Sequence, residues 1–152
     1  MQAGDHRPTP PLLNAPRGLE LLEQELDRLN RDPNVPEKTR RLRRRLADAS
    51  AEAGRCVEER LFTLSAPTGT GKTLAMLRFA LTRAARDPRI RRIVVVLPFL
   101  TILDQTVCTY RKLFATMGEH YLLEHHSLTG TRGRGATQGD EQSESAKEAR
   151  LL

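Results

Sequence analysis

The segment 66–73 combines the residue types and the spacing of a Walker A phosphate-binding loop, with alanine in its first position. Gly69 and Gly71 let successive backbone N–H groups turn toward a phosphate, because glycine has no Cβ in the way. Lys72 would then reach the β and γ phosphates as the catalytic cation, and the Thr73 hydroxyl would coordinate Mg²⁺. The predicted site takes ATP and Mg²⁺ and consists of Ala66, Pro67, Thr68, Gly69, Thr70, Gly71, Lys72 and Thr73.

The segments on both sides of this loop predict the elements that position it. The apolar run 61–64 is typical of a buried parallel strand, and leucines at helical spacing over 74–84 predict a helix that ends before Pro88. The β-branched run 93–97 predicts a second strand, and residues 121–123 predict a third. We therefore expect an α/β fold, in which a parallel sheet is flanked by helices.

The remaining chain predicts three regions. Residues 1–35 read as a linker with one short helix that repeats leucine at positions 19, 22, 26 and 29. Residues 36–126 hold the nucleotide-binding region, which opens with a second helix and includes a further helix over 102–114. The expected apolar face of the second helix consists of Leu42, Leu46, Ala49, Ala53 and Val57. Residues 127–152 are polar and predict a mobile loop followed by the start of another helix.

Charge and cysteine content narrow the class of protein. The chain has 25 Lys and Arg against 19 Asp and Glu, and its excess of positive charge lies mostly within residues 61–126, which suits a polyanionic partner. The basic run 38–45 is more typical of a solvated helix face than of a dedicated nucleic-acid patch. Cys56 and Cys108 fit no metal-site spacing, and neither a signal peptide nor a membrane span is evident, so we expect a reduced, cytoplasmic protein without a membrane partner.

The sequence lacks a recognisable acidic residue for nucleotide hydrolysis. Phosphate-loop hydrolases hold Mg²⁺ with an acidic residue that follows a later buried strand. In this sequence Pro98 directly follows the run 93–97, where the acidic residue would stand. Asp104 lies inside the expected helix that comes next. The sequence therefore predicts either a protein that binds a nucleotide without hydrolysing it, or one piece of a longer protein.

Three segments together resemble the first RecA-like lobe of the CRISPR-associated helicase-nuclease of type I systems, a superfamily 2 helicase of the DEAD/DEAH type. They are APTGTGKT at 66–73, LPFLTILDQT at 97–106 and LLEHHS at 122–127, and the resemblance covers roughly residues 36–127. It implies a partial RecA-like lobe in which motif I binds ATP and Mg²⁺. It also implies that Pro98, Thr101 and Gln105, around motif Ia, contact single-stranded DNA or another nucleic acid, and that a CRISPR surveillance complex is a partner.

The sequence departs from that family at several motifs. It contains no His-Asp dipeptide for the nuclease site, no Asp-Glu-x-His box and no second lobe with its arginine. Leu100 stands where many members have a small polar residue, and His125 and His126 lack the neighbours that would complete a metal site. The resemblance thus implies a fragment that ends before motif II and is inactive as a helicase by itself.

Two other functions fit parts of the sequence. A small phosphate-loop kinase would use Arg132 and Arg134 on a lid over the phosphates. A non-catalytic nucleic-acid-binding module would use the basic helix 38–45 and would keep the phosphate loop as a relic.

Overall fold

The computed structural model describes residues 12–56 and 58–125. It contains four α-helices: α1 (Ala15–Asn30), α2 (Glu37–Arg55), α3 (Lys72–Arg86) and α4 (Leu100–Leu113). Two short 3-10 helices, η1 (Ala115–Met117) and η2 (Glu119–Tyr121), follow α4. The chain divides into two compact units at residues 122 and 123, and all six helices lie in the first unit.

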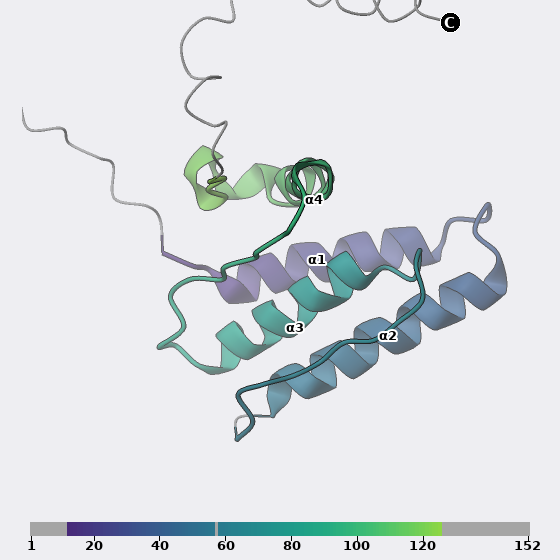
Figure 1. Ribbon diagram of the computed structural model, residues 1–152, viewed down its shortest axis with the longest axis horizontal. Helices are drawn as coiled ribbons and strands as arrows, with labels where there is room; N and C mark the ends of the chain where they lie inside the picture. Colours follow the sequence, from purple (N-terminus) through teal and green to yellow (C-terminus); the bar gives the residue numbers. More distant parts are fainter. Residues whose placement is uncertain (1–11, 57, 126–152) are drawn as a thin grey trace, which may run out of the picture. The chain divides into compact units, whose positions relative to one another are not determined.

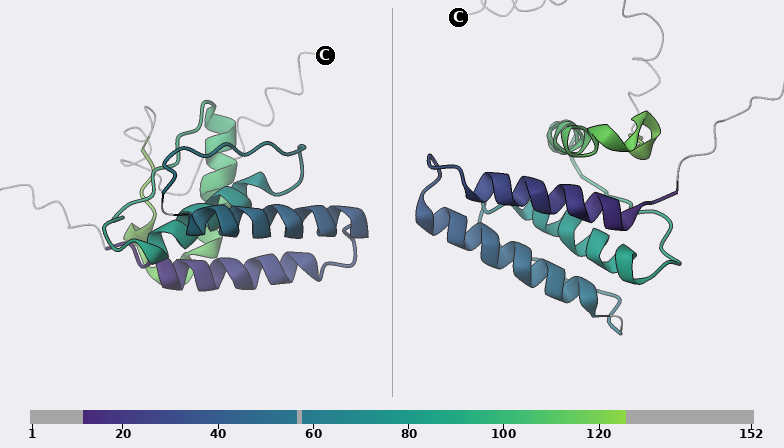
Figure 2. Two further views of the ribbon diagram at one scale, coloured as in Figure 1. Left: turned by 90° about the horizontal axis from the view of Figure 1, so that it is seen from below. Right: turned by 180° about the vertical axis from the view of Figure 1, so that it is seen from behind.

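Helix α3 is the centre of the first unit. Figures 1 and 2 show α1, α2 and α3 running side by side, with α3 in contact with both of the others. The core includes Leu22 of α1, which is completely buried, and Leu81 of α3, which is 1% exposed. Tyr110 and Phe114 from the α4 region complete this core, and Phe114 packs edge to face against Tyr121 with ring centroids 5.2 Å apart. The helix that follows the phosphate loop is therefore held on several sides.

A charged cluster at Arg78 joins the three helices. Its guanidinium donates to both carboxylate oxygens of Glu23 on α1, at 2.7 and 2.9 Å, and to Asp48 on α2 at 2.8 Å. Burial lowers the pKa of Arg78, but the hydrogen bonds with Asp48 and Glu23 outweigh it and raise the pKa overall. Arg78 thus stays charged while it ties α1 and α2 to α3.

Helix α2 is confirmed, but its predicted apolar face is only partly right, since Leu46 and Ala53 are half-buried. The residues that it buries are Ala47, Ser50, Ala51 and Gly54, whereas Leu42 and Ala49 are exposed and Val57 lies outside the described residues. The buried residues are small, so the α2 and α3 backbones approach closely. Close backbone approach, rather than burial of leucine, therefore sets the orientation of α2.

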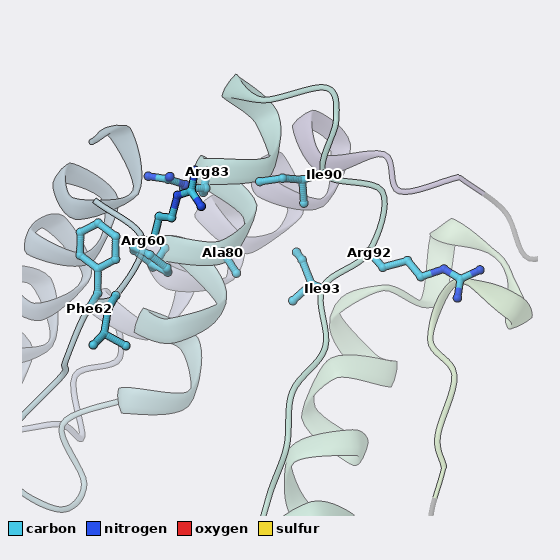
Figure 3. A pocket seen from close by; sticks show the side chains of 9 residues that line it. Arg60, Phe62, Ala80, Arg83, Ile90, Arg92 and Ile93 are labelled. Carbon is cyan, nitrogen blue, oxygen red and sulfur yellow. The ribbon is translucent and has the colours of Figure 1, made fainter. Parts of the chain in front are cut away.

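The predicted α/β fold, a partial RecA-like lobe with a parallel sheet, is wrong for the described residues, which contain helices but no strand. Segments 61–64 and 93–97 have no strand assignment, and Tyr121 lies in η2 rather than in a third strand. A strand needs a hydrogen-bonded neighbour, but segments 60–62 and 90–93 lie on opposite sides of a cavity of about 390 Å³ over α3 (Figure 3). Each segment packs on α3 separately, with Phe62 against Phe79 at a centroid distance of 4.9 Å.

Replacing Gly54 with alanine should destabilise the protein, although alanine normally favours a helix. A Cβ at position 54 would lie 2.7 Å from the backbone oxygen of Phe79 and 3.0 Å from the Cβ of Thr82. Because a backbone atom cannot move as a side chain can, we expect a loss of about 1 to 3 kcal/mol, to be measured by urea unfolding followed by helical circular dichroism. The exposed Arg44→Ala on the same helix should change stability by less than about 0.5 kcal/mol. A Gly54→Ala protein as stable as the unaltered one would contradict close packing of α2 on α3.

Candidate nucleotide-binding site

The loop ahead of α3 has two glycines in a conformation that other residues rarely adopt. Gly69 and Gly71 have φ values of 79° and 83°, in the left-handed region that disfavours side chains. The hydroxyl of Thr70, which is buried, donates to the carbonyl of Pro67 at 2.6 Å. The ammonium group of Lys72 donates to the carbonyl of Ala66 at 2.8 Å. These two contacts close the segment 66–73 into a compact loop.

The loop ends at the beginning of α3, whose amides are available to an anion. Gly71 is the N-cap residue and supplies no side-chain cap, although its carbonyl accepts the amide of Ala75 at 3.0 Å. The first N–H groups of a helix have no acceptor within the helix, and they carry the positive end of its dipole. The start of α3 therefore offers backbone donors beside Lys72 and Thr73.

A cavity of about 540 Å³ opens at this loop. The loop contributes Thr68 to Thr73, and the facing wall comes from residues of α1 and α2 together with Gln105 of α4. Its charged lining residues are Lys72 and Arg43, and no carboxylate lines it. Two cations without an acidic neighbour, next to the start of a helix, make this cavity suited to an anionic ligand.

Arg43 approaches the loop from α2. Its Nη2 donates to the carbonyl of Gly69 at 3.3 Å, and its Cγ lies 3.8 Å from the place that a Cβ would take at Gly71. The sequence placed Arg43 in a solvated basic face, and the structure corrects this for two members of the run, Arg40 and Arg43, which are both half-buried. Lys38, Arg41, Arg44 and Arg45 are exposed, whereas Arg43 is half-buried against the loop.

Tyr110 ties the start of α3 to α4. Its hydroxyl donates to the backbone carbonyl of Thr73 at 3.3 Å, and burial raises the pKa of Tyr110 to about 12. The backbone carbonyl of Thr73 is thus tied to α4. The contact fixes the end of the loop against the core.

This pKa predicts that the protein loses stability in alkali. Because the folded state holds the Tyr110 proton more tightly than the unfolded state, whose tyrosine titrates near pH 10, the stabilisation is complete below pH 10 and is lost as the pH rises to about 12. We expect a loss of about 2 to 3 kcal/mol from this group in urea unfolding at a series of pH values. Tyr110→Phe removes the ionisable group, so the variant should have a shallower fall over the same interval. Equal slopes for the two proteins would contradict the burial of this phenol.

The structure brings together most of the residues predicted for the nucleotide. Residues 68–73 line the cavity, while Ala66 and Pro67 hold the loop through their carbonyls. Gln105, predicted for nucleic acid, lines this same cavity, whereas Pro98 and Thr101 are exposed and lie outside its lining. Sequence reasoning missed Asn30 and Leu26 of α1 as further lining residues, because no local signal distinguishes them from other residues of an amphipathic helix.

Other predicted features lie outside this cavity. Arg132 and Arg134, the lid of the kinase hypothesis, and His126 fall outside the described residues. Cys56 and Cys108 are free, and no cluster of metal-ligating side chains occurs in the described part of the chain. None of its helices is sufficiently long and apolar to span a membrane.

Comparison with known proteins identifies the family. Curated proteins and solved structures give no match to this chain. Residues 34–150, more than half of the chain, match the family described as type III restriction enzyme, res subunit. This is a helicase-like family, and its members use ATP and Mg²⁺ in general and bind nucleic acid. The phosphate loop and the cavity beside it therefore belong to a chain that is a member of the type III restriction enzyme res subunit family, within a helicase superfamily.

Proposed function

We propose that this chain is the ATP-binding and nucleic-acid-binding part of a CRISPR-associated DNA helicase of the DEAD/DEAH type. The observation that carries the nucleotide assignment is the loop itself. Gly69 and Gly71 are in left-handed conformations, and the loop runs into an uncapped helix that begins at Lys72. The cavity beside it has two cations and no carboxylate in its lining, which favours a polyphosphate over a neutral ligand.

In the proposed complex each loop residue has a definite task. Backbone amides from Thr68 to Thr73 would bind phosphate oxygens, and the Lys72 ammonium, which donates to the Ala66 carbonyl, would bind the phosphates in its place. The exchange is favourable because a hydrogen bond between two charged groups is stronger than one to a neutral carbonyl. The Thr73 hydroxyl would hold the Mg²⁺ that accompanies ATP, and the hydrogen bond from Tyr110 to the Thr73 carbonyl positions this residue.

Hydrolysis is not part of the proposed activity of these residues alone. The described cavity has no carboxylate in its lining that could hold Mg²⁺ or orient a water molecule. Asp104 is exposed on α4 and does not line the cavity. We therefore propose nucleotide binding without turnover by the described residues, with nucleic acid bound through Pro98, Thr101 and Gln105.

Titration of the full chain with a fluorescent ATP analogue in the presence of Mg²⁺ tests the nucleotide assignment. We expect saturable binding that unlabelled ATP displaces, with phosphate release no faster than in the absence of protein. Fluorescence anisotropy with a labelled single-stranded oligonucleotide tests the second partner, and its affinity should fall steeply as salt is added. A chain that folds and binds neither ligand would refute the proposal.

The CRISPR assignment has separate tests. The gene should lie beside a CRISPR array and genes for a type I surveillance complex, and the purified chain should bind that complex when it carries target DNA. A gene beside a restriction-modification methyltransferase instead would contradict this part of the proposal and leave the ATP site intact.

A further inference from the structure

We propose that Arg43 is a phosphate-binding residue of the nucleotide site, supplied by α2 rather than by the loop. This inference rests on the proposed function and adds a second cation to the site. It gives α2, which precedes the phosphate loop in the chain, a direct role in holding the ligand.

The position of Arg43 on α2 explains how it reaches the loop. Residues 43, 47, 50 and 54 are spaced by four, three and four, so they fall on one stripe of the helix. The other three members, Ala47, Ser50 and Gly54, are the small buried residues of α2. Since that stripe faces α3, its arginine extends toward the loop that immediately precedes α3.

The contacts of Arg43 leave most of its donors available. The described residues place no carboxylate within ion-pair distance of Arg43, and its polar contact there is the 3.3 Å bond to the Gly69 carbonyl. Its neighbour on the same helix, Arg40, instead pairs with Glu37 at 2.9 Å, and Arg78 pairs with two acids. A guanidinium has five N–H donors, so Arg43 can still present a pair of them to a phosphate.

Burial and charge make a phosphate the ligand that fits best. Arg43 and Lys72 line one cavity, and no carboxylate is in its lining, so an anion bound in the cavity would be attracted by both cations. A phosphate accepts charge-assisted hydrogen bonds in the paired geometry that a guanidinium offers, and these bonds are stronger than the existing bond to a carbonyl. A nucleotide base would offer no compensating charge. The ligand group that Arg43 recognises is therefore the phosphate chain.

Binding of ATP and of inorganic tripolyphosphate, each with Mg²⁺, to the full chain tests this inference by isothermal titration. We expect Arg43→Gln to weaken both ligands by about tenfold to a hundredfold, because the lost contact is to phosphate. Arg44→Gln removes the same charge from an exposed neighbour, and it should weaken both by less than about twofold. Tripolyphosphate affinity that is unchanged in Arg43→Gln would overturn the inference, even if ATP affinity fell.

The melting temperature and the salt dependence of binding distinguish a phosphate contact from a purely structural role, here called a brace, in which Arg43 only holds the loop in place. A brace would lower the melting temperature of the ligand-free protein but leave the salt dependence of binding as steep as before. A phosphate contact should leave the ligand-free melting temperature of Arg43→Gln within about 2 °C and make the salt dependence shallower, since one cation no longer meets the anion. An unchanged salt dependence would overturn the inference.

The outcome also distinguishes this inference from the proposed function on which it rests. If the unaltered chain folds but binds neither ligand, both fail. If it binds both and Arg43→Gln binds them equally well, only the role of Arg43 fails. Should Arg43→Gln fold poorly by circular dichroism, Arg43→Lys keeps the charge but offers a single donor group, and it should weaken tripolyphosphate by an intermediate factor. Full affinity in Arg43→Lys would contradict a paired contact.

Discussion

Lys72→Ala should weaken MgATP binding by about a hundredfold, the largest effect that we expect from a single change in the loop. The side chain starts at the first residue of α3, and its ammonium lies within the loop, 2.8 Å from the Ala66 carbonyl. Without the Lys72 ammonium, the β and γ phosphates would interact only with backbone N–H donors and with Arg43 of α2. Isothermal titration with ATP measures the loss.

The matched control for this change is Lys112→Ala, which removes the same group from an exposed site in the last turn of α4. Its ATP affinity should stay within about twofold of the unaltered chain, because exposed charges at a distance are screened by salt. Both variants should keep the helical circular dichroism spectrum. An ATP affinity for Lys72→Ala equal to that of Lys112→Ala would show that the ligand does not enter the loop.

Leu81→Ala should cost about 2 to 5 kcal/mol of stability, the largest folding effect that we expect. Leu81 is among the least exposed side chains of α3, and it contacts Gly18 of α1 so closely that a Cβ there would lie 3.1 Å from its Cδ2. Truncation would leave a cavity between α1 and α3 that rigid helices cannot fill. Since small domains have only about 5 to 15 kcal/mol in total, the variant should be partly unfolded at moderate temperature.

Leu12→Ala is the control for the core substitution, because it deletes the same atoms from a side chain that is 76% exposed. It should change the urea midpoint little, whereas Leu81→Ala should shift it strongly with a similar slope. Equal midpoints in the two variants would mean that α1 and α3 do not share the core described above.

The helices and the phosphate loop could be predicted from the sequence because their signals are local. The leucine spacing around Leu22 and Leu81 identifies helix faces, and both residues are buried as the spacing indicates. The paired glycines predict a loop that turns without a Cβ in the way, and the structure has left-handed backbone at Gly69 and Gly71. Each of these features depends on a few neighbouring residues.

Whether a sheet forms and where Arg43 lies depend on residues that are distant in the sequence. The local pattern therefore predicted strands that are not assigned, and it gave no signal that Arg43 contacts the loop. A β-branched run such as 93–97 favours extended backbone, but pairing requires a partner strand. In the described residues no strand is assigned, and the starts of the runs 61–64 and 93–97 line a cavity over α3. Arg43 resembles its exposed neighbours until the packing of α2 is known. Only the small residues Ala47, Ser50 and Gly54 hint that its stripe faces inward.

The segment 93–97 has a practical consequence for work on this protein. Val94 and Val96 are 80% and 85% exposed, and in the described residues neither lies in a hydrogen-bonded strand. Exposed aliphatic side chains next to unpaired backbone amides favour self-association. Two molecules that associate through such a segment bury the side chains and pair the amides at the same time. This segment should therefore limit the solubility of the protein at high concentration. We expect Val96→Lys to raise that solubility.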